Sequence, residues 1–394
     1  METLKLTEAR NLAVNASLLK SNVLSLEEII KHMSYIQIDT ISAVERAHHI
    51  TLWNRDSDYS KIDLNSLHAK EKRIFEYWSH AASYIPIEDY RFYLPLMKSY
   101  FDPMQKWVKD RYEKVKDIMP NVLKRIEQEG PLGSKDFKTS GKKNGQWWNW
   151  KPGKFALEML FWQGKLMVKE RKNFHRIYDL TERVLPDHID TKVPSEEELG
   201  EFLVTRAIKA LGIATERDII EYFQVYSKDI KQKAIEKLEK NKTLLQVKIE
   251  GLDDIYYTTQ KNLEKDQQNQ KTGVFILSPF DNFIINRKRT LRLFNFDYAL
   301  ECYVPSAKRK FGYFVHPILC DGNFIGRLDP KADRKKKVLH IKNLLLEDPN
   351  LDEKVLPTLA TAIREFAEFN ECEKIEFEEI MPKKLKQTMN GLLR

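Results

Sequence analysis

The segment 35–40 places an amide and a carboxylate two residues apart, between apolar residues. In an extended backbone Gln37 and Asp39 point to one face, and Ile36 and Ile38 point to the other. We expect the polar pair to face a cleft and the apolar pair to face a core. A carboxylate in a cleft can orient or deprotonate a water molecule. The spacing by itself leaves two ordinary alternatives, a surface-facing strand pair and a helix cap.

Histidines are further candidates for chemistry. His48 and His49 are adjacent, as in half of a metal site, but the sequence shows no third ligand and no His-Glu-x-x-His motif. A role in the core or in hydrogen bonding is the favoured interpretation. His80 is a lone histidine that is either structural or close to the polar pair. We therefore treat His48 and His80 as candidate active-site neighbours, and we expect neither a metal nor a cofactor.

Positive charge is concentrated in two regions of a chain with a net charge of +8. Residues 287–337 contain 13 Lys/Arg against 5 Asp/Glu, and residues 135–183 contain 12 against 5. The remainder of the chain is therefore net acidic. This distribution indicates a polyanionic partner. A solvated, lysine-rich surface is the alternative.

Composition places the chain among globular proteins, because 42% of its residues are hydrophobic and 31% are charged. Its 394 residues correspond to about two to four domains. We find no run of about 18 uncharged apolar residues and no apolar core of a signal peptide, so we expect no membrane span. Cys302, Cys320 and Cys372 form no CxxC pair. This favours a reducing cytosol and argues against cysteine-ligated zinc.

The elements that position the polar pair are predicted to be mostly helical. Apolar spacing predicts a helix over 6–14 with Thr7 as its N-cap. Ser25 and Glu28 form a capping box for a second helix, which precedes the polar pair. We assign residues 1–114 to a first winged-helix module that carries the polar pair.

Two further modules repeat one order of elements. In the first of these we expect helices at 121–129, near 134–137 and at 154–162, and a hairpin formed by 165–168 and 176–180. In the second we expect helices at 197–211, from 215 and at 229–240, and a hairpin formed by 244–247 and 254–258. Three helices followed by a two-stranded wing form a winged helix. We place these modules at 115–190 and 191–268.

The last region, 269–394, is predicted to be β-rich and follows a Gln- and Asn-rich linker at 261–270. Asp321-Gly322 is a strong hairpin signal between the apolar runs 314–319 and 323–328. Further elements are expected as strands at 274–277, 338–346 and 374–377 and as a helix at 355–369. The predicted fold class is mainly α with β (α+β), with tandem winged-helix modules and a C-terminal β-rich domain.

Two sets of segments carry a family resemblance. In the N-terminal part they are Ile36–Ile41, Glu45–His49, Leu52–Arg55 and Glu76–Ala82. In the C-terminal part they are Leu277–Asp281, Arg287–Thr290, Phe296–Tyr298, Tyr303–Arg309 and Gly326–Arg334. On these segments the sequence resembles the winged-helix DNA glycosylases of the YcaQ/AlkZ family. Matches at both ends of the chain are difficult to attribute to coincidence.

The resemblance implies modules that surround a DNA channel and a monofunctional glycosylase without a lyase step. It implies excision of alkylated purines, typically N7-alkylguanine, and unhooking of interstrand crosslinks. The family's catalytic motif of Gln, an aliphatic residue and then Gln or Asp corresponds to Gln37, Ile38 and Asp39, in the Asp version of the YcaQ branch. Asp39 is then expected to stabilise an oxocarbenium-like sugar and to activate water. Gln37 is expected to position the water or the sugar.

The channel is expected to bind phosphates through Lys and Arg, without reading sequence. Its candidate lining residues are Arg287, Lys288, Arg289, Lys308, Arg309, Lys310, Arg327 and Lys331. The expected partner is double-stranded DNA with alkylated or crosslinked bases. We expect a monomer that is cytoplasmic and associated with the nucleoid, with no membrane partner.

A non-catalytic winged-helix DNA-binding protein, such as a transcription regulator, is the alternative function. A regulator needs no carboxylate in a cleft and normally repeats a sequence-reading helix in a dimer. A nuclease is disfavoured because no cluster of Asp and Glu for a metal stands out in the sequence. Asp39 therefore discriminates between the two leading functions.

Overall fold

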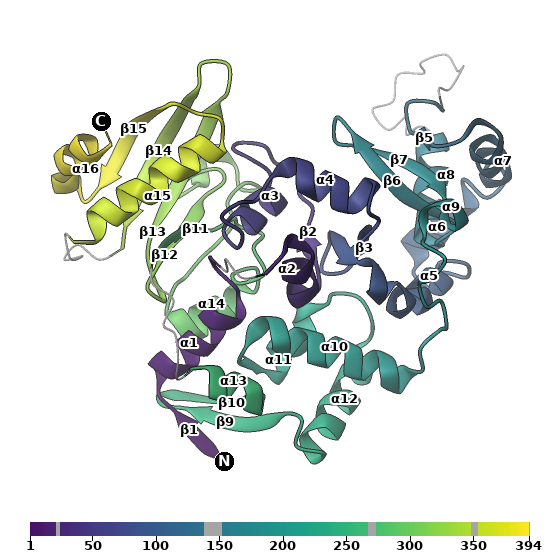
Figure 1. Cartoon of the computed structure of the whole chain (residues 1–394), viewed down its shortest axis with the longest axis horizontal. Helices are drawn as coiled ribbons and strands as arrows, with labels where there is room; N and C mark the ends of the chain where they lie inside the picture. The colour runs from purple at the N-terminus through teal and green to yellow at the C-terminus, as the bar shows by residue number, and fades with distance from the viewer. Residues whose placement is uncertain (21–23, 138–151, 267–272, 348–353, 394) are drawn as a thin grey trace.

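One order of elements recurs along the computed structural model, which describes residues 1–20, 24–137, 152–266, 273–347 and 354–393. Within these residues a helix, a two-residue strand, one or two further helices and a two-stranded wing follow one another three times. This is the order of a winged helix. A β-rich domain follows, so the predicted α+β class is confirmed (Figure 1).

The first module carries the polar pair. Its elements are α2 (Leu26–Met33), β2 (Ile36–Gln37), α3 (Ala47–Trp53), α4 (Lys61–Ala69), β3 (Ile74–Trp78) and β4 (Ala82–Pro86), with the sheet order β2-β4-β3. Ser25 caps α2 as predicted, since its hydroxyl accepts the Glu28 N–H and the Glu28 carboxylate accepts the Ser25 N–H at 2.8 Å. The strand is shorter than the extended segment that we predicted, because the chain leaves the sheet after residue 37.

The second module is joined to the first by η1 (Ile87–Tyr93), α5 (Leu94–Ser99) and α6 (Lys106–Glu113). Its elements are α7 (Met119–Glu129), β5 (Leu132–Gly133), α8 (Pro152–Trp162), β6 (Leu166–Lys172), β7 (His175–Leu180) and α9 (Thr181–Val184), with the sheet order β5-β7-β6. The short helix predicted at 134–137 is wrong. A turn lies there, in which the Asp136 carboxylate accepts the Gly133 N–H at 2.8 Å.

The third module contains α10 (Glu196–Leu211), β8 (Ala214–Thr215), α11 (Glu216–Tyr222), α12 (Lys228–Lys240), β9 (Leu245–Ile249) and β10 (Leu252–Thr258). Thr215 and Asp218 form the predicted capping box of α11. The predicted linker begins instead as a helix, α13 (Gln260–Asp266).

The N-terminus of the chain lies with this third module rather than with the first. Strand β1 (Glu2–Leu4) pairs parallel to β9 and extends the sheet to β1-β9-β10-β8. Helix α1 (Leu6–Ala16) buries Leu12 and Val14 in the apolar cluster that contains Val247 of β9. The predicted N-cap Thr7 is also wrong, because α1 begins at Leu6 and its N-cap is Lys5. The predicted segment 1–114 therefore does not form one continuous module.

The C-terminal domain is built on a five-stranded sheet, in the order β11-β12-β13-β14-β15. Its strands are β11 (Val274–Ile276), β12 (His316–Cys320), β13 (Asn323–Asp333), β14 (Val338–Leu346) and β15 (Lys374–Met381). Its helices are α14 (Arg287–Phe294), η2 (Ser306–Lys308), α15 (Val355–Phe369), η3 (Lys383–Leu385) and α16 (Lys386–Leu392). The hairpin at Asp321-Gly322 is confirmed, and both turn residues have positive φ. Helix α15 covers one face of the sheet (Figure 1).

The first module lies between the second module and the C-terminal domain (Figure 1). A fully buried, bidentate ion pair joins Arg55 to Asp281, with N–O distances of 2.7 and 2.8 Å. The amide of the neighbouring Asn54 donates to the Ile276 carbonyl at 2.9 Å. These contacts fix the module that carries Gln37 and Asp39 to the β-rich domain. In the described part of the chain, no helix combines the length and the apolar character needed to cross a membrane.

Candidate active site

A long connection after a short strand creates the candidate site. In the third module β8 leads directly into α11, because Thr215 ends the strand and caps the helix. In the first module residues 38–46 separate β2 from α3. This connection begins at the sheet, where the Ile38 N–H donates to the Ala82 carbonyl at 2.7 Å. It carries Asp39 near its start and Arg46 at its end.

Asp39 is nearly buried, since only 8% of the residue is exposed. One carboxylate oxygen accepts the Ile41 N–H at 2.9 Å. Burial raises the pKa of Asp39 to about 6, although hydrogen bonds from the Ile41 and Thr40 backbone and the charge of Arg46 partly oppose this rise. The group is therefore mostly ionised at neutral pH and only weakly solvated. A carboxylate of this kind suits a general base or a stabiliser of a nearby positive charge.

Gln37 is half-buried on β2, opposite Ser83 of β4. Its side-chain amide oxygen is buried and has no hydrogen-bond partner among the residues that the structure describes. An unsatisfied buried acceptor costs free energy that a hydrogen-bond donor from a substrate or a water would remove. Ile36 and Ile38, the flanking residues, are buried in one apolar cluster, as predicted from their alternation.

Three histidines of the first module, His48, His49 and His80, pack against neighbouring side chains. His48 is 2% exposed, its ring stacks on Phe174 with centroids 6.0 Å apart, and burial lowers its pKa well below 6.5. His49 contacts the Tyr59 hydroxyl through Nδ1 at 2.6 Å. His80 stacks on Tyr35 with centroids 6.1 Å apart, and burial lowers its pKa as well. These rings are neutral at physiological pH, so they supply shape and hydrogen bonds rather than charge.

Cations gather around the connection 38–46. The Glu45 carboxylate binds Arg334 at 2.9 Å and Lys61 at 3.3 Å, so both of these charges are compensated. The charge of Arg46 acts on Asp39 and lowers its pKa. Arg46 belongs to a segment that carried the family resemblance, but no role was predicted for it from the sequence. Its significance comes from spatial neighbours that are distant along the chain.

A loop of the C-terminal domain also lies beside Asp39. Desolvation raises the pKa of both Cys302 and Tyr303, and the charge of Asp39 adds to this rise in each. The Glu301 carboxylate holds the loop in shape by accepting the backbone N–H groups of Lys310, Phe311 and Gly312 at 2.8–3.1 Å. Tyr303 is 81% exposed, which is unusual for a large aromatic residue. Sequence reasoning missed this residue, since its exposure depends on the folded loop.

The candidate channel residues fall into three groups by exposure. Those on the surface are Lys288, Lys308, Lys310 and Lys331. Arg287 and Arg309 are half-buried, and their guanidinium groups donate to backbone carbonyls of their own segments. The four surface lysines fit a role in phosphate binding, whereas the two arginines have only part of their donors available.

Arg289 and Arg327 are buried, which removes them from the candidate set. Arg289 is 1% exposed and donates to the Leu211 carbonyl at 2.8 Å. Arg327 is held between the rings of Phe296 and Phe311, each 4.3 Å from the guanidinium carbon. It also binds Glu347 at 2.5 Å. These arginines tie structural elements together, and a run of basic letters in the sequence does not distinguish them from surface residues.

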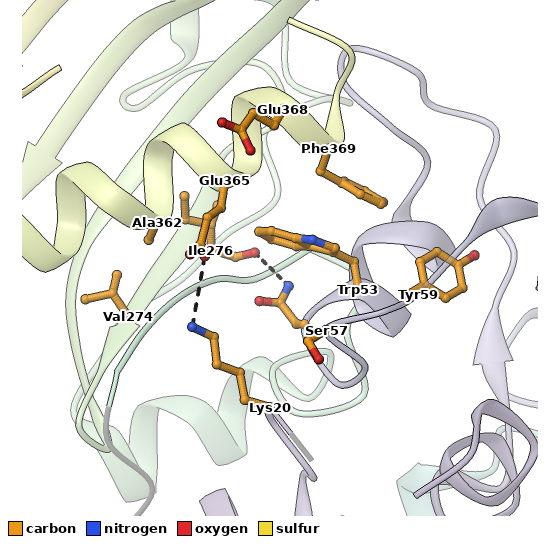
Figure 2. A pocket seen from close by; sticks show the side chains of 11 residues that line it. Lys20, Trp53, Ser57, Tyr59, Val274, Ile276, Ala362, Glu365, Glu368 and Phe369 are labelled. Atoms are coloured by element: carbon orange, nitrogen blue, oxygen red, sulfur yellow. Dashed lines mark hydrogen bonds and ion pairs between the residues drawn. The ribbon is translucent and has the colours of Figure 1, made fainter. Parts of the chain in front are cut away.

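A cavity of about 500 Å³ lies between the first module and the C-terminal domain (Figure 2). Trp53 and Phe369 stack in it with centroids 5.0 Å apart, and Lys20 pairs with Glu365 at 4.0 Å. Neither Gln37 nor Asp39 is among its lining residues. Among the residues described, no group of three or more His, Cys, Asp or Glu is arranged to hold a metal ion.

Comparisons with known proteins agree with this fold. The family model "DNA glycosylase AlkZ-like" matches residues 30–369, which include β2, the connection 38–46 and most of the C-terminal domain. The solved structure of the Streptomyces sahachiroi DNA glycosylase AlkZ superposes with a TM-score of 0.68 at 14% sequence identity. The superposition covers 97% of this chain and 100% of that chain, and it shows a shared fold. Because the family model spans most of its length, the chain belongs to the AlkZ-like DNA glycosylase family.

Proposed function

We propose that this DNA glycosylase is monofunctional, and that it hydrolyses the N-glycosidic bond of alkylated purines such as N7-alkylguanine. The observation that carries the proposal is the nearly buried, ionisable carboxylate of Asp39, which follows by two residues Gln37 and its buried, unpaired amide oxygen. Family membership favours this function over a non-catalytic winged-helix regulator, which has no use for such a carboxylate.

Asp39 supplies negative charge where the reaction develops positive charge. N7 alkylation makes guanine a cationic leaving group, so its departure needs no general acid. The deoxyribose becomes oxocarbenium-like as the bond breaks. A carboxylate about 4 Å from this cation, at an effective dielectric of about 20, stabilises it by about 4 kcal/mol. This corresponds to about a thousandfold in rate.

The attacking water is positioned by the same pair of residues. Ionised Asp39, with a pKa of about 6, accepts a proton from the water near neutral pH. Gln37 accepts a hydrogen bond from the water or the sugar through its amide oxygen, which contributes about 1 kcal/mol. Among the described residues, the cation whose charge acts on Asp39 is the guanidinium of Arg46, whereas a lyase step needs an amine that forms a Schiff base. Hydrolysis alone is therefore the proposed reaction.

We assign DNA binding to surface lysines and to the loop of the C-terminal domain that carries Tyr303. Lys288, Lys308, Lys310 and Lys331 contact phosphates of double-stranded DNA, and Tyr303 stacks on a base near the lesion. A site formed by a connection and a surface loop, rather than by a closed pocket, also admits a crosslinked base that cannot rotate out freely. Unhooking of interstrand crosslinks by a monomer is therefore part of the proposal.

The experiment that tests the proposed function measures release of a damaged base. The purified chain is incubated with a duplex that contains one N7-methylguanine, and abasic sites are detected as alkali-labile breaks. A second duplex carries a nitrogen-mustard crosslink, and an undamaged duplex of the same sequence is the control. We expect excision from both damaged duplexes. Excision no faster than spontaneous depurination would contradict the proposal.

A further inference from the structure

The wing of the second module ends in a phenylalanine that packs on the first module. Strands β6 and β7 are joined by Asn173 and Phe174, whose φ angles are +49° and +66°. A positive φ is uncommon for a bulky aromatic residue, so tertiary contacts have to maintain this turn. The Phe174 ring stacks on the buried His48 with an interplanar angle of 13°. The wing tip is thus part of the surroundings of the connection 38–46.

A buried carboxylate fastens the wing in this position. Glu76 of β3 accepts hydrogen bonds from Arg171 at 2.5 and 2.7 Å and from Arg176 at 3.0 Å. Burial by itself would raise the pKa of Glu76, but the charges of the two arginines outweigh it and hold the pKa at about 2. Glu76 is therefore ionised at every physiological pH. This wing is held against the first module and does not extend freely as a probe of a DNA groove.

The ring of Phe174 at the wing tip supports Arg46, which forms no ion pair within the described residues, although the charges of Glu45 and Asp39 act on it. The guanidinium carbon of Arg46 lies 3.8 Å from the centroid of the Phe174 ring, and that of Arg171 lies 4.4 Å from it. Nε of Arg46 is buried without a hydrogen-bond partner. The two terminal nitrogens are not among the buried, unpaired atoms of the described residues, and the half-buried side chain therefore exposes this end to solvent.

The charges around Arg46 favour an anionic ligand. Arg171 shares the single charge of Glu76 with Arg176, which leaves one positive charge in excess, whereas Arg334 and Lys61 are balanced by Glu45 and Glu371. Burial and the charges of Arg171 and Arg334 lower the pKa of Arg46, while the charges of Glu45 and Asp39 raise it. An uncompensated guanidinium beside a developing oxocarbenium would also slow the reaction, because like charges repel. A phosphate bound to Arg46 removes this repulsion.

We propose that Arg46, supported on the ring of Phe174, binds a phosphodiester of the damaged strand next to the nucleotide on which Asp39 acts. The terminal nitrogens of a guanidinium match the geometry of phosphate oxygens and can bind them in a bidentate manner. Phe174 is a positioning residue that presents the guanidinium through a cation–π contact. The wing of the second module therefore completes a phosphate site in the first module. This inference rests on the proposed function, because it assumes that Asp39 acts on a nucleotide of DNA.

The test compares the salt dependence of duplex binding between variants. Each protein phosphate contact contributes about −0.9 to the slope of log K against log salt. Arg46→Gln is expected to weaken binding about tenfold at low salt and to reduce the magnitude of the slope by about one. The ratio of the wild-type affinity to the Arg46→Gln affinity should shrink about threefold to fourfold between about 50 and 200 mM salt. Arg46→Lys keeps the charge and is expected to retain the slope.

Variants of the wing tip test the positioning role. Phe174→Leu removes the π face and is expected to give a slope between those of the wild type and Arg46→Gln, whereas Phe174→Tyr restores the wild-type value. Arg364→Gln, which removes an exposed cation from α15, is the matched control for loss of charge. Thermal melts verify that each variant is folded.

The outcomes separate this inference from the proposed function. If the wild type excises N7-methylguanine but Arg46→Gln shows the wild-type salt slope, the phosphate site is refuted and the glycosylase function stands. If Phe174→Leu behaves as the wild type, the positioning role of the wing is refuted. If the wild type excises no damaged base, the proposed function fails, whereas the salt slopes still decide whether Arg46 contacts DNA.

Discussion

Lowering the pH should inactivate base excision through one carboxyl group, Asp39. Burial raises its pKa to about 6, against 3.8 for an ordinary aspartate. The proposed mechanism needs the ionised form, so activity is present above the pKa and is lost below it. Asp39 is almost fully ionised near pH 8 and only about one-tenth ionised near pH 5. An unperturbed aspartate would remain mostly ionised at the lower pH.

The assay is single-turnover release of N7-methylguanine from a duplex, at constant ionic strength and saturating protein, between about pH 4.5 and 8.5. Spontaneous depurination is measured without protein at each pH and subtracted. We expect the rate to fall about tenfold per pH unit below a midpoint near 6. A rate that stays constant down to about pH 5 would refute the assignment of the mechanism to a desolvated carboxylate. Binding measured at each pH shows whether a fall in rate reflects a loss of affinity.

Three further predictions concern buried charges and stability. Because the pKa of Asp39 is higher in the folded protein than in the unfolded chain, the protonated side chain favours the folded state. This contribution to the free energy of unfolding is fully present below about pH 4 and is lost as the pH rises through about 6. Asp39→Asn should therefore raise the free energy of unfolding near pH 8 by about 3 kcal/mol, measured by urea denaturation. Glu76→Gln should lower it by about 3–5 kcal/mol, because two arginines lose their buried partner. Asp281→Asn should lower it by a similar amount, about 3–5 kcal/mol, because Arg55 is left buried and unpaired.

The exposed pair Arg125–Glu129 is the matched control for the two ion-pair variants. Glu129→Gln is expected to leave the urea midpoint unchanged, since an ion pair on the surface contributes little. If Glu129→Gln lowered the free energy of unfolding as much as Glu76→Gln does, burial would not explain the importance of the Glu76 ion pairs. A destabilised Asp39→Asn would contradict the argument that desolvation of Asp39 strains the folded state.

Local signals predicted the helices and wings of the structure well. The Ser25–Glu28 and Thr215–Asp218 capping boxes mark helix starts within a few residues, and the backbone atoms that they satisfy belong to the same turn. The predicted helix at 355–369 and strand at 338–346 agree with α15 and β14. Such signals lie within one element, so the sequence displays them directly.

Features that depend on distant partners were not predictable in this way. The pairing of β1 with β9 joins residues at positions 2–4 and 247–249, and no local pattern indicates it. Arg289 and Arg327 look like surface cations in the sequence, but folding buries them against backbone carbonyls and aromatic rings. The stacking of Phe174 below Arg46 likewise brings two modules together.

In the candidate site, too, local features were predictable from the sequence, whereas features that depend on distant residues were not. The alternation of segment 36–39 correctly indicated which residues face the core, because alternation is a property of one extended segment. The burial of Asp39, and with it the rise of its pKa, depends on how that segment packs in the folded protein. The ion pair between Arg55 and Asp281 joins two of the segments that carry the family resemblance, Leu52–Arg55 and Leu277–Asp281, which lie far apart in the sequence.

The most direct test of the central claim compares base release and DNA binding in Asp39→Asn. This variant keeps the shape of the side chain and removes its charge. We expect single-turnover release of N7-methylguanine to fall about a thousandfold. The affinity for the same duplex should be unchanged or higher, because a buried negative charge no longer faces the phosphates. Base release at the wild-type rate by a folded Asp39→Asn protein would contradict the account.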